Sequence, residues 1–518
     1  PHQRSLLRFL WWKDGDFSKE ILEYQMCTHI FGGASSPSCS NYALIKTAID
    51  NRHKFGDMAA KTLMKNFYVD DLLKSIGSVD AAIGLIGNVI KMCAAGGFKL
   101  TKFLSNNLEV LESIPEEDRR IGVKNQDLLA GKLPEEKALG VLWNTNEDTL
   151  GFRITLMEKP LTRRGLLAML SSVFDPLGLV APFLLKGRKI IQVLCKGNFK
   201  WDDPIPEDIQ HQWLKWKNQL VLLDDIKVSR CYKPKNFGKV IEYSLHHFSD
   251  ASEEGYGQAS YLRMVNEEGN IHCTLVVGKS RVTPLKFISI PRLELTAAVL
   301  SVKISKQLQE ELEIDGYDGE IKEIFWTDSQ VVLHYINNNS KRFKVFIANR
   351  IQMIRDNTNT LQWNYVRSEE NPEDSASRGL DANMKKKVNQ WFDGPLFLHQ
   401  PEVTWNMSKE IGEIEADDLE VKCAVNTVYV EQDLLSKFEK ISKWGKMKRV
   451  MNIILQFKER ALQLCRNKAS KELISINNLD KAQQKILRLA QEKAFYQELR
   501  LLEKGKSVPR SSSMFKLD

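Results

Sequence analysis

Four carboxylates in the middle of the chain lie where apolar runs end or helical patterns begin. Asp250 ends the run HHFSD, and Asp328 ends the run EIFWTD. Glu294 opens a helical pattern in RLELTAAVL, and Asp374 lies just past the run LQWNYVRS. Because strand ends and helix starts meet at the carboxyl edge of an α/β sheet, we expect these four side chains to cluster at one edge.

Divalent cations are the natural partners of such a cluster, since four carboxylates repel one another without them. Mg²⁺ (or Mn²⁺) suits an all-oxygen ligand set. Two such ions, about 4 Å apart, would activate a water and stabilise the leaving oxygen in phosphodiester cleavage. We therefore expect the four acids to be catalytic and to bind two metal ions. The alternative is that they are ordinary turn and cap residues, which are common at these positions.

A second pair of carboxylates lies in FYVDDLL, residues 67–73, a stretch that predicts strand, tight turn and strand. Asp70 and Asp71 would lie at the tip of this hairpin. There they could bind metal ions against the phosphates of an incoming nucleotide. An ordinary surface hairpin has the same pattern, so that alternative stays open.

The elements that position these acids follow from the periodicity of apolar residues. Residues 236–385 alternate β-type runs with helical patterns such as ELTAAVLSVKISKQLQEEL and SQVVLHYINN, which is typical of an α/β domain. The β-type runs are VIEYSLHHFSD, GQASYLRM, HCTLVVGKSRV, EIFWTDS and LQWNYVRS. Residues 1–155 mix helical periodicity with short strand-like runs, and residues 156–235 begin as a helix and become rich in Trp and Pro.

The C-terminal part differs in charge. Residues 386–430 are loop-rich, and residues 431–518 predict two amphipathic helices, the first with apolar residues at helical spacing from Leu434 to Cys465. Residues 431–518 also hold 20 Lys and Arg against 10 Asp and Glu, so the net charge of +8 comes from this tail. A basic run of this kind indicates either a nucleic-acid contact or a solvated helix face.

Length and composition limit the classes of protein. A chain of 518 residues suggests about three or four domains. A hydrophobic content of 43% with 27% charged residues excludes wholesale disorder. We find no targeting pattern and no apolar stretch approaching the roughly 18 residues of a membrane-spanning helix. Eight cysteines without a C-x-x-C pair predict reduced thiols, and hence an intracellular protein, cytoplasmic or nuclear, with no membrane partner.

The motifs around the four central acids resemble the ribonuclease H domain of BEL/Pao-type retrotransposon polyproteins. The matching stretches are FSDAS, RLEL, WTDS and NPEDSASRG. The resemblance implies a mixed five-stranded sheet flanked by helices. It also implies that Asp250, Glu294, Asp328 and Asp374 form a two-metal site that cuts RNA in an RNA–DNA hybrid. A histidine often assists in related enzymes, and none is evident near Asp374.

The N-terminal motifs resemble the palm of a reverse transcriptase, which implies an RNA template and a DNA primer as partners. FGGASSPSCSNYALIK (31–46), GGFKLTKFLSNN (96–107) and KALGVLWN (137–144) resemble the palm motif before YVDD, the one after it, and the primer grip. The implied nucleic-acid contacts are Gly32, Gly33, Pro37, Lys99, Lys102, Gly140 and Trp143. A polymerase needs a further Asp and fingers, which the family places before residue 1, so we expect no polymerisation by this chain alone.

The segment between these regions resembles the BEL/Pao connection, in TRRGLLAMLSSVFDPLGLVAPFLLKGRKIIQ and FKWDDPIPEDIQHQW. An aspartic peptidase is disfavoured, because the chain has no Asp-Thr-Gly or Asp-Ser-Gly. We expect Asp175, Asp202 and Asp203 to be turn and cap residues. The tryptophans of this segment are expected to pack in the protein.

These patterns together predict an α/β chain with four parts and an α-helical tail. They are a reverse transcriptase palm remnant (1–155, α+β), a thumb or connection segment (156–235), a ribonuclease H-like domain (236–385), and a linker with basic helices (386–518). The tail resembles the stretch before an integrase module, and the integrase and protease parts of such a polyprotein are expected elsewhere. The predicted activity is two-metal hydrolysis of RNA in RNA–DNA hybrids. The alternative is a non-catalytic nucleic-acid-binding relic.

Overall fold

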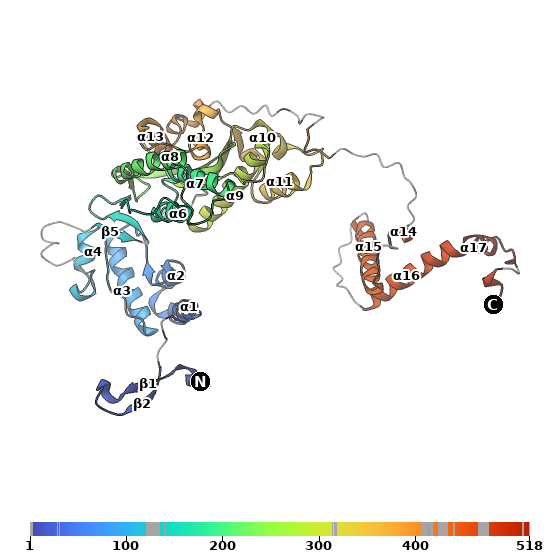
Figure 1. Cartoon of the computed structure of the whole chain (residues 1–518), viewed down its shortest axis with the longest axis horizontal. Coiled ribbons are helices and arrows are strands. Elements are labelled where there is room, and N and C mark those ends of the chain that lie inside the picture. The colour runs from blue at the N-terminus through green and yellow to red at the C-terminus, as the bar shows by residue number, and fades with distance from the viewer. Residues whose placement is uncertain are drawn as a thin grey trace. The chain divides into compact units, whose positions relative to one another are not determined.

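The chain folds into two compact units, Pro1–Lys422 and Cys423–Asp518, in a computed structural model (Figure 1). The structure describes residues 4–27, 30, 32–120, 135–138, 140–312, 314, 317, 319–405, 412, 414, 418–422, 434–438, 441–464, 476–509 and 512–516. Among these residues, no helix has both the length and the apolar character that crossing a membrane requires.

A mixed five-stranded sheet with the strand order β11-β10-β9-β12-β13 organises the first unit. Three antiparallel strands form a meander: β9 (Val240–Ala251), β10 (Gly255–Asn266) and β11 (Ile271–Val282). Two strands extend it in parallel with β9: β12 (Lys322–Thr327) and β13 (Trp363–Tyr365). This confirms the predicted α/β class and the mixed five-stranded sheet.

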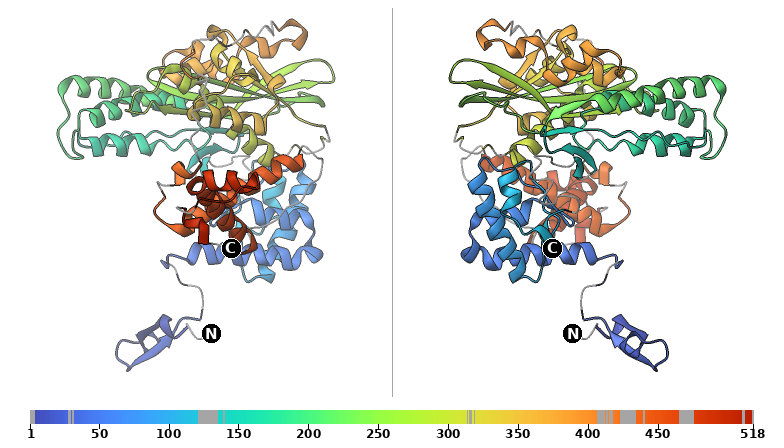
Figure 2. Two further views of the ribbon diagram at one scale, coloured as in Figure 1. Left: turned by 90° about the vertical axis from the view of Figure 1, so that its right-hand side faces the viewer. Right: turned by 90° about the vertical axis from the view of Figure 1, so that its left-hand side faces the viewer.

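Helices cover both faces of this sheet (Figure 2). The face that carries Phe248 and Trp326 packs in one core with α7 (Ala181–Lys196), α12 (Glu373–Arg378) and α13 (Lys385–Asp393). The opposite face, with Phe325, packs with α9 (Ile290–Glu311), α10 (Gln330–Asn337) and α11 (Val345–Asn357). Neighbouring residues such as Phe325 and Trp326 serve opposite cores because successive side chains of a strand alternate in direction.

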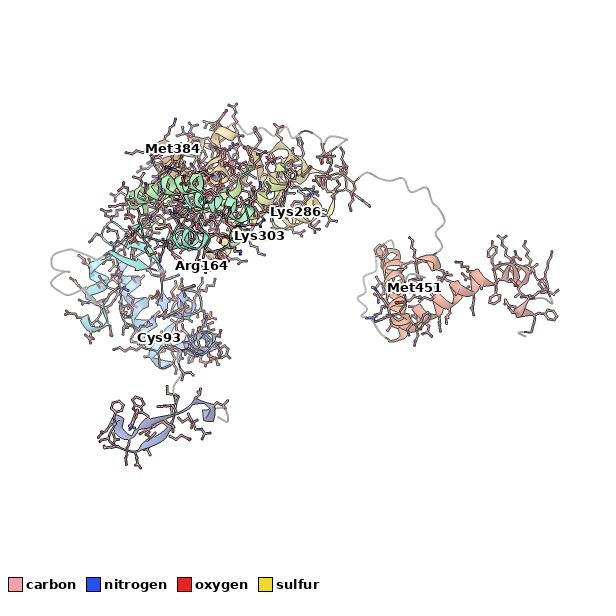
Figure 3. The ribbon with its side chains drawn as sticks, in the orientation of Figure 1. Cys93, Arg164, Lys286, Lys303, Met384 and Met451 are labelled. Atoms are coloured by element: carbon pink, nitrogen blue, oxygen red, sulfur yellow. The ribbon has the colours of Figure 1, made fainter. Side chains whose placement is uncertain are left out.

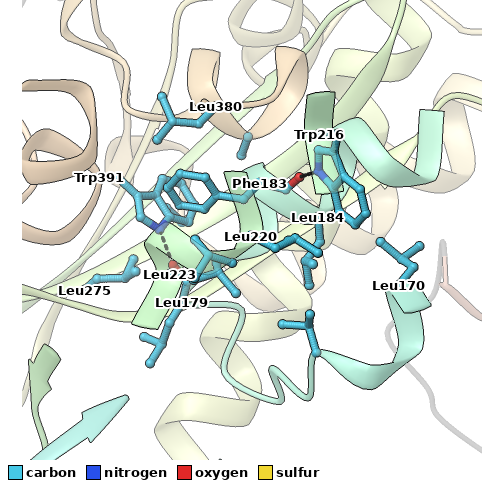
Figure 4. Close-up of a cluster of buried hydrophobic side chains, with 14 of the residues drawn as sticks. Leu170, Leu179, Phe183, Leu184, Trp216, Leu220, Leu223, Leu275, Leu380 and Trp391 are labelled. Carbon is cyan, nitrogen blue, oxygen red and sulfur yellow. Dashed lines mark hydrogen bonds between the residues drawn. The ribbon is translucent and has the colours of Figure 1, made fainter. Parts of the chain in front are cut away.

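The larger core joins segments that are far apart in the sequence. It takes side chains from α6 (Arg163–Ser172), α7 and α8 (Glu207–Gln219), as well as from the sheet and from α13. The Trp391 indole donates to the Leu179 carbonyl at 2.8 Å, and the Trp216 indole donates to the Phe183 carbonyl at 2.9 Å (Figure 4). Packing of Trp213 and Trp216 is confirmed, since both are buried, but Trp201 is exposed and lies under the Arg163 guanidinium. The predicted boundary at residue 235 therefore falls inside one core, and the domain limits remain predictions.

The N-terminal part of this unit holds a hairpin, a helical cluster and a small sheet. The hairpin pairs β1 (Arg8–Trp12) with β2 (Ile21–Gln25). The helices are α1 (Ser36–Phe55), α2 (Asp57–Lys65), α3 (Val79–Ala95) and α4 (Leu108–Glu112). The first three share a core that includes Cys93 (Figure 3), whereas Leu111 of α4 belongs to a separate cluster. The antiparallel sheet is β5 (Glu135–Ala138), β6 (Val141–Asn144), β7 (Thr149–Gly151) and β8 (Lys227–Ser229).

The second unit is helical, as the sequence predicts. Its helices are α14 (Leu434–Phe438), α15 (Trp444–Leu464), α16 (Ile476–Ala494) and α17 (Tyr496–Glu503). Its core contains Phe438, Met451 and Ile486 (Figure 3). Only part of the first predicted apolar stripe is buried, because Phe438 lies in the core while Ile453 and Phe457 are exposed. Cys465 lies outside the described residues.

Candidate active site

Asp250 and Asp328 lie side by side at the carboxyl ends of two neighbouring parallel strands. In β9 and β12, Ser249 is the register partner of Thr327, so the next residue on each strand is one of the two acids. Such an edge is where open α/β sheets present ligand-binding side chains. Glu294 lies near the start of α9, within the first two turns of this helix. The structure therefore places these three acids on the elements that the sequence predicts.

A serine hydroxyl holds each of these three carboxylates. Ser377 Oγ donates to Asp250 Oδ2 at 2.6 Å, from α12. Ser329 Oγ donates to Glu294 Oε2 at 2.5 Å, and it also caps the start of α10. Ser368 Oγ donates to Asp328 Oδ2 at 2.6 Å. Each hydroxyl fixes the direction of one carboxylate and leaves the other lone pairs of that carboxylate free for a ligand.

The three acids repel one another, and the effect is largest at Asp250. Burial, together with the charges of Asp328 and Glu294, raises the pKa of Asp250 from 3.8 to about 7, against the opposing hydrogen bond from Ser377. Burial and the charge of Asp328 also raise the pKa of Glu294. A bound cation would remove this repulsion, because it favours the ionised form of each acid. The electrostatics of the site thus match an all-oxygen cation ligand set.

The complete metal cage remains a prediction. Within the part of the chain that the structure describes, no group of three or more His, Cys, Asp or Glu side chains is arranged to hold a metal ion. The donor chemistry of Asp250, Glu294 and Asp328 nevertheless fits Mg²⁺ or Mn²⁺. These three residues are the ones that would bind the ions.

Asp374 does not join the other three acids in this structure. It lies on α12, where its carboxylate forms an ion pair with Arg378 Nε at 2.5 Å and lies 3.9 Å from Lys387 Nζ. Its predicted role in metal binding therefore remains untested. Joining the site would require its carboxylate to exchange these two basic partners for a cation.

The neighbouring Glu373 is a carboxyl group that sequence reasoning did not single out. It is fully buried, and neither of its side-chain oxygens has a hydrogen-bond partner among the described residues. Burial and the charge of Asp250 raise the pKa of Glu373 well above its usual range. A Cβ on Gly257, the register partner of Asp250, would lie 2.8 Å from Glu373 Oε2, so the glycine makes room for this carboxyl group. The only signal in the sequence is its place beside Asp374 in NPED.

The predicted FYVDDLL hairpin is confirmed. Its strands are β3 (Phe67–Tyr68) and β4 (Asp71–Leu72), with Val69 and Asp70 at the turn. Val69 has a φ of 58°, which is an unfavourable value for a β-branched residue. Asp70 and Asp71 are exposed at the tip. Their binding of polymerase metals remains a prediction.

The other residues predicted to contact nucleic acid are spread over several elements. Pro37 lies in the first turn of α1, Gly32 precedes that helix with a φ of 85°, and Gly33 follows Gly32. Lys99 pairs with Asp118 at 3.3 Å, and Lys102 is exposed. These placements leave their predicted roles untested.

In the predicted primer grip, Gly140 has a φ of 87°, and a Cβ there would lie 2.7 Å from the Phe174 ring. The Trp143 indole donates to Asp148 at 3.0 Å, and Arg230 binds the same carboxylate through two nitrogens, at 2.6 and 2.8 Å. Trp143 is thus held within the protein. Leu139 lies outside the described residues, and the roles of this stretch remain predictions.

Two of the three aspartates of the connecting segment have the turn and cap roles that the sequence predicts, and Asp202 instead forms an exposed ion pair. Asp175 accepts hydrogen bonds from the backbone N–H groups of Leu179 and Val180, at 2.8 and 2.9 Å. Asp203 accepts one from the Lys200 N–H at 2.8 Å, and Asp202 pairs with the Arg164 guanidinium. These contacts confirm Asp175 and Asp203 as turn and cap residues.

Comparison with known proteins gives one family match, and no curated protein matches the chain. The Pao retrotransposon-like RNaseH-like domain model matches residues 162–329, which include Asp250, Glu294 and Asp328.

Solved structures give weak overall similarity. The RNase H1 of Halobacterium salinarum has 14% identity and a TM-score of 0.18, over 27% of this chain and 94% of its own. LC11-RNase H1 in complex with an RNA/DNA hybrid has 9% identity and a TM-score of 0.19, over 26% and 93%. The protease-reverse transcriptase of prototype foamy virus has 14% identity and a TM-score of 0.18, over 71% and 41%.

The fold assignment rests on the strand order and on the family match, since these TM-scores are low. The matched stretch contains α6 to α8, four strands of the central sheet, and the three interacting acids. Residues 162–329 match the Pao retrotransposon-like RNaseH-like domain model, which confirms the resemblance to Pao-type retrotransposon polyproteins.

Proposed function

We propose that the first unit hydrolyses the RNA strand of RNA–DNA hybrids, using two divalent cations bound by Asp250, Glu294, Asp328 and Asp374. The observation that supports this most strongly is the raised pKa of Asp250, to about 7, in a group of acids that comes from three different elements. A structural role alone gives no reason to bring these charges together. A cation-binding role does give such a reason, because bound cations stabilise the ionised form of each acid.

The residues of the chain divide the work in the following way. The cations, when bound, supply an activated water and stabilise the charge on the leaving oxygen. Asp250 must lose its proton before it can bind them, which it does near neutral pH. Ser377, Ser329 and Ser368 keep the three carboxylates oriented while this happens. Asp374 is proposed to join from α12 after it leaves Arg378.

The test is the substitution Asp328→Asn, with cleavage and binding of a labelled RNA–DNA hybrid measured separately. Asn keeps the size of the side chain and can still hydrogen-bond with Ser368, but it has no charge to bind a cation. Loss of transition-state stabilisation of this kind costs about two to three orders of magnitude or more in rate. Hybrid binding should remain, because it depends on Lys and Arg contacts with phosphates.

Asp202→Asn is the matched control. Asp202 is exposed and pairs with Arg164 on α6, so the same chemical change there should leave the cleavage rate unchanged. Cleavage by the Asp328→Asn protein at the wild-type rate would show that the carboxylate assignment is wrong.

A nucleic-acid-binding protein without catalysis is the second candidate. The ion pair of Asp374 with Arg378 favours it, since this pairing neutralises the charge of one of the four acids that are proposed to bind metal ions. Hybrid binding without cleavage in Mg²⁺ or Mn²⁺ by the wild-type chain would establish this candidate.

A further inference from the structure

Two arginines, one from α9 and one from α11, lie over the ring of one phenylalanine. The Arg350 guanidinium lies 3.4 Å from the centre of the Phe346 ring, and the Arg292 guanidinium lies 4.9 Å from it. Arg292 lies two residues before Glu294 on α9, and because successive helical residues turn by about 100°, the two side chains leave the helix on different sides. Burial and the charge of Arg292 lower the pKa of Arg350, so the pair is electrostatically suited to an anion.

A short segment with two acids, residues 418–422, lies against Arg292 of this pair. Glu420 accepts two parallel hydrogen bonds from Arg292, at 2.6 and 2.9 Å. Asp418 accepts from the Tyr335 hydroxyl with both carboxylate oxygens, at 2.9 and 3.1 Å. The backbone of the segment pairs with residues 342–344: the Lys344 N–H donates to Glu420 O at 2.8 Å, and the Lys422 N–H donates to Arg342 O at 2.7 Å.

We propose that Arg292 and Arg350 form a binding site for a phosphate of the nucleic-acid backbone, and that Glu420 occupies this site in the free protein. This inference rests on the proposed function, because it takes the RNA–DNA hybrid as the ligand. The acidic segment is then a competitor that the hybrid displaces when it binds.

The geometry of the contact supports a phosphate as the natural ligand. A guanidinium binds carboxylates and phosphates with the same two-pronged arrangement of hydrogen bonds, so Glu420 shows the geometry that a phosphate would adopt. The segment also lies between further basic residues, since Arg342 and Lys344 are both exposed beside it. A phosphate backbone would therefore meet several positive charges on this part of the first unit.

Exposure of the ion pair allows the exchange. The Arg292 side chain is 32% exposed, whereas that of Glu420 is 13% exposed. The pair is therefore open to solvent on the arginine side, and a ligand can approach it from there. A hybrid brings many phosphates at once, so it can displace one carboxylate from this partly exposed arginine.

The experiment measures hybrid affinity by fluorescence anisotropy with the whole chain in EDTA, where no cleavage can occur. Glu420→Gln should lower the Kd about fivefold, because the competitor loses its charge. Arg292→Gln should raise the Kd and reduce the slope of log Kd against log salt by about one, since a phosphate contact is lost. In the double variant, Glu420→Gln should bring no gain, because its benefit acts through Arg292.

Glu402→Gln provides the matched control. Glu402 pairs with Lys322 at 2.6 Å, at the opposite end of β12 from Asp328, so the same change in net charge there should leave the Kd within about twofold of wild type. Arg292→Lys serves as a second variant if Arg292→Gln does not fold. Lysine keeps the charge but loses the two-pronged bond, so the Kd of Arg292→Lys should lie between those of wild type and Arg292→Gln.

Two outcomes would overturn this inference. One is a Glu420→Gln protein that binds no more tightly than wild type or the Glu402→Gln control. The other is an equal gain from Glu420→Gln when Arg292 is absent. A chain that never cleaves but still shows the Arg292-dependent gain would refute the proposed hydrolysis and leave this binding site intact.

Discussion

At the scale of single residues, the proton on Asp250 links the candidate site to the stability of the protein. Folding raises its pKa from 3.8 to about 7, so the folded state holds a proton that the unfolded state has released over that pH range. Stability falls with rising pH wherever the folded state binds more protons. The contribution of Asp250 is therefore fully present below pH 4 and is lost as the pH rises through about 7.

We expect the melting temperature of the cation-free protein to fall between pH 5 and pH 8. Asp250→Asn should make this fall smaller, because the amide has no charge to bury at pH 8. Mg²⁺ should raise the melting temperature of wild type at pH 8 more than that of the variant, since an ion that binds only the folded state stabilises it. Thermal unfolding in EDTA and in Mg²⁺ measures both effects. An unchanged pH dependence in Asp250→Asn, equal to that of Asp202→Asn, would contradict the assignment.

The same scale shows what the sequence could predict about the site. Asp250 and Asp328 were predictable, because a strand that ends at an acid places that acid at the sheet edge whatever the rest of the fold does. Glu373 and Asp374 were not distinguishable, since consecutive residues of a helix point about 100° apart and only packing decides which one is buried. The serine partners depend on contacts between elements up to 127 residues apart, which no local pattern contains.

At the scale of elements, a close backbone contact joins the start of α7 to the central sheet. Gly178 has a φ of 71°, and a Cβ there would lie 1.8 Å from the Gly278 carbonyl oxygen on β11. The Gly278 N–H donates to the Leu177 carbonyl at 2.9 Å, so the two backbones are fixed against each other. Trp391 also packs on Gly278, since its ring lies 2.6 Å from the point that a Cβ on Gly278 would occupy.

Gly178→Ala should therefore destabilise the first unit by about 3 kcal/mol or more, because neither backbone can move away from the added methyl group. Gly269→Ala is the control. Gly269 has a similar φ of 83° in the turn after β10, but nothing lies within 4 Å of its Cβ position. Gly269→Ala should lower the free energy of unfolding by only about 1–2 kcal/mol, because alanine disfavours this backbone conformation. Urea unfolding followed by tryptophan fluorescence compares the two, and equal losses would show that the contact contributes little.

The elements themselves were largely predictable, but their assembly was not. Each of the five strands and the helices α9 and α10 followed from alternating or helical periodicity. The attachment of α7 to β11 did not, because a Pro- and Gly-rich stretch such as FDPLGLVAP predicts only a turn and gives no information about the backbone that it touches. The division of the apolar stripe in the tail helices has the same origin, since solvent and core are distinguished only by packing.

At the scale of the whole molecule, the three interacting acids and the acidic segment all lie in the first unit, Pro1–Lys422. The second unit has its own core of Phe438, Met451, Ala482 and Ile486. Most of the excess positive charge lies in residues 431–518. The candidate catalytic acids and the net positive charge of the chain are thus in different units.

Removal of residues 423–518 should leave the turnover rate at saturating hybrid unchanged, because none of the proposed catalytic residues is lost. The hybrid affinity should fall at low salt and differ less from wild type at high salt, since the removed charge acts through phosphate contacts. Single-turnover cleavage and anisotropy at two salt concentrations distinguish the two effects. A truncated chain that binds hybrid but has lost turnover would show that the second unit contributes to catalysis.

The larger core also sets the order in which a nascent chain can fold. Its side chains run from Phe152 to Trp405, and Trp391 contacts both Leu179 and the sheet. Ribosomes add about 5–20 residues per second, so α6 emerges about 10–50 s before the last residues that cover its partners. In the later part of that interval, the β9–β11 meander has been synthesised, but α12 and α13, which cover its apolar face, have not. Exposed apolar surface of this kind is prone to aggregation until α12 and α13 cover it.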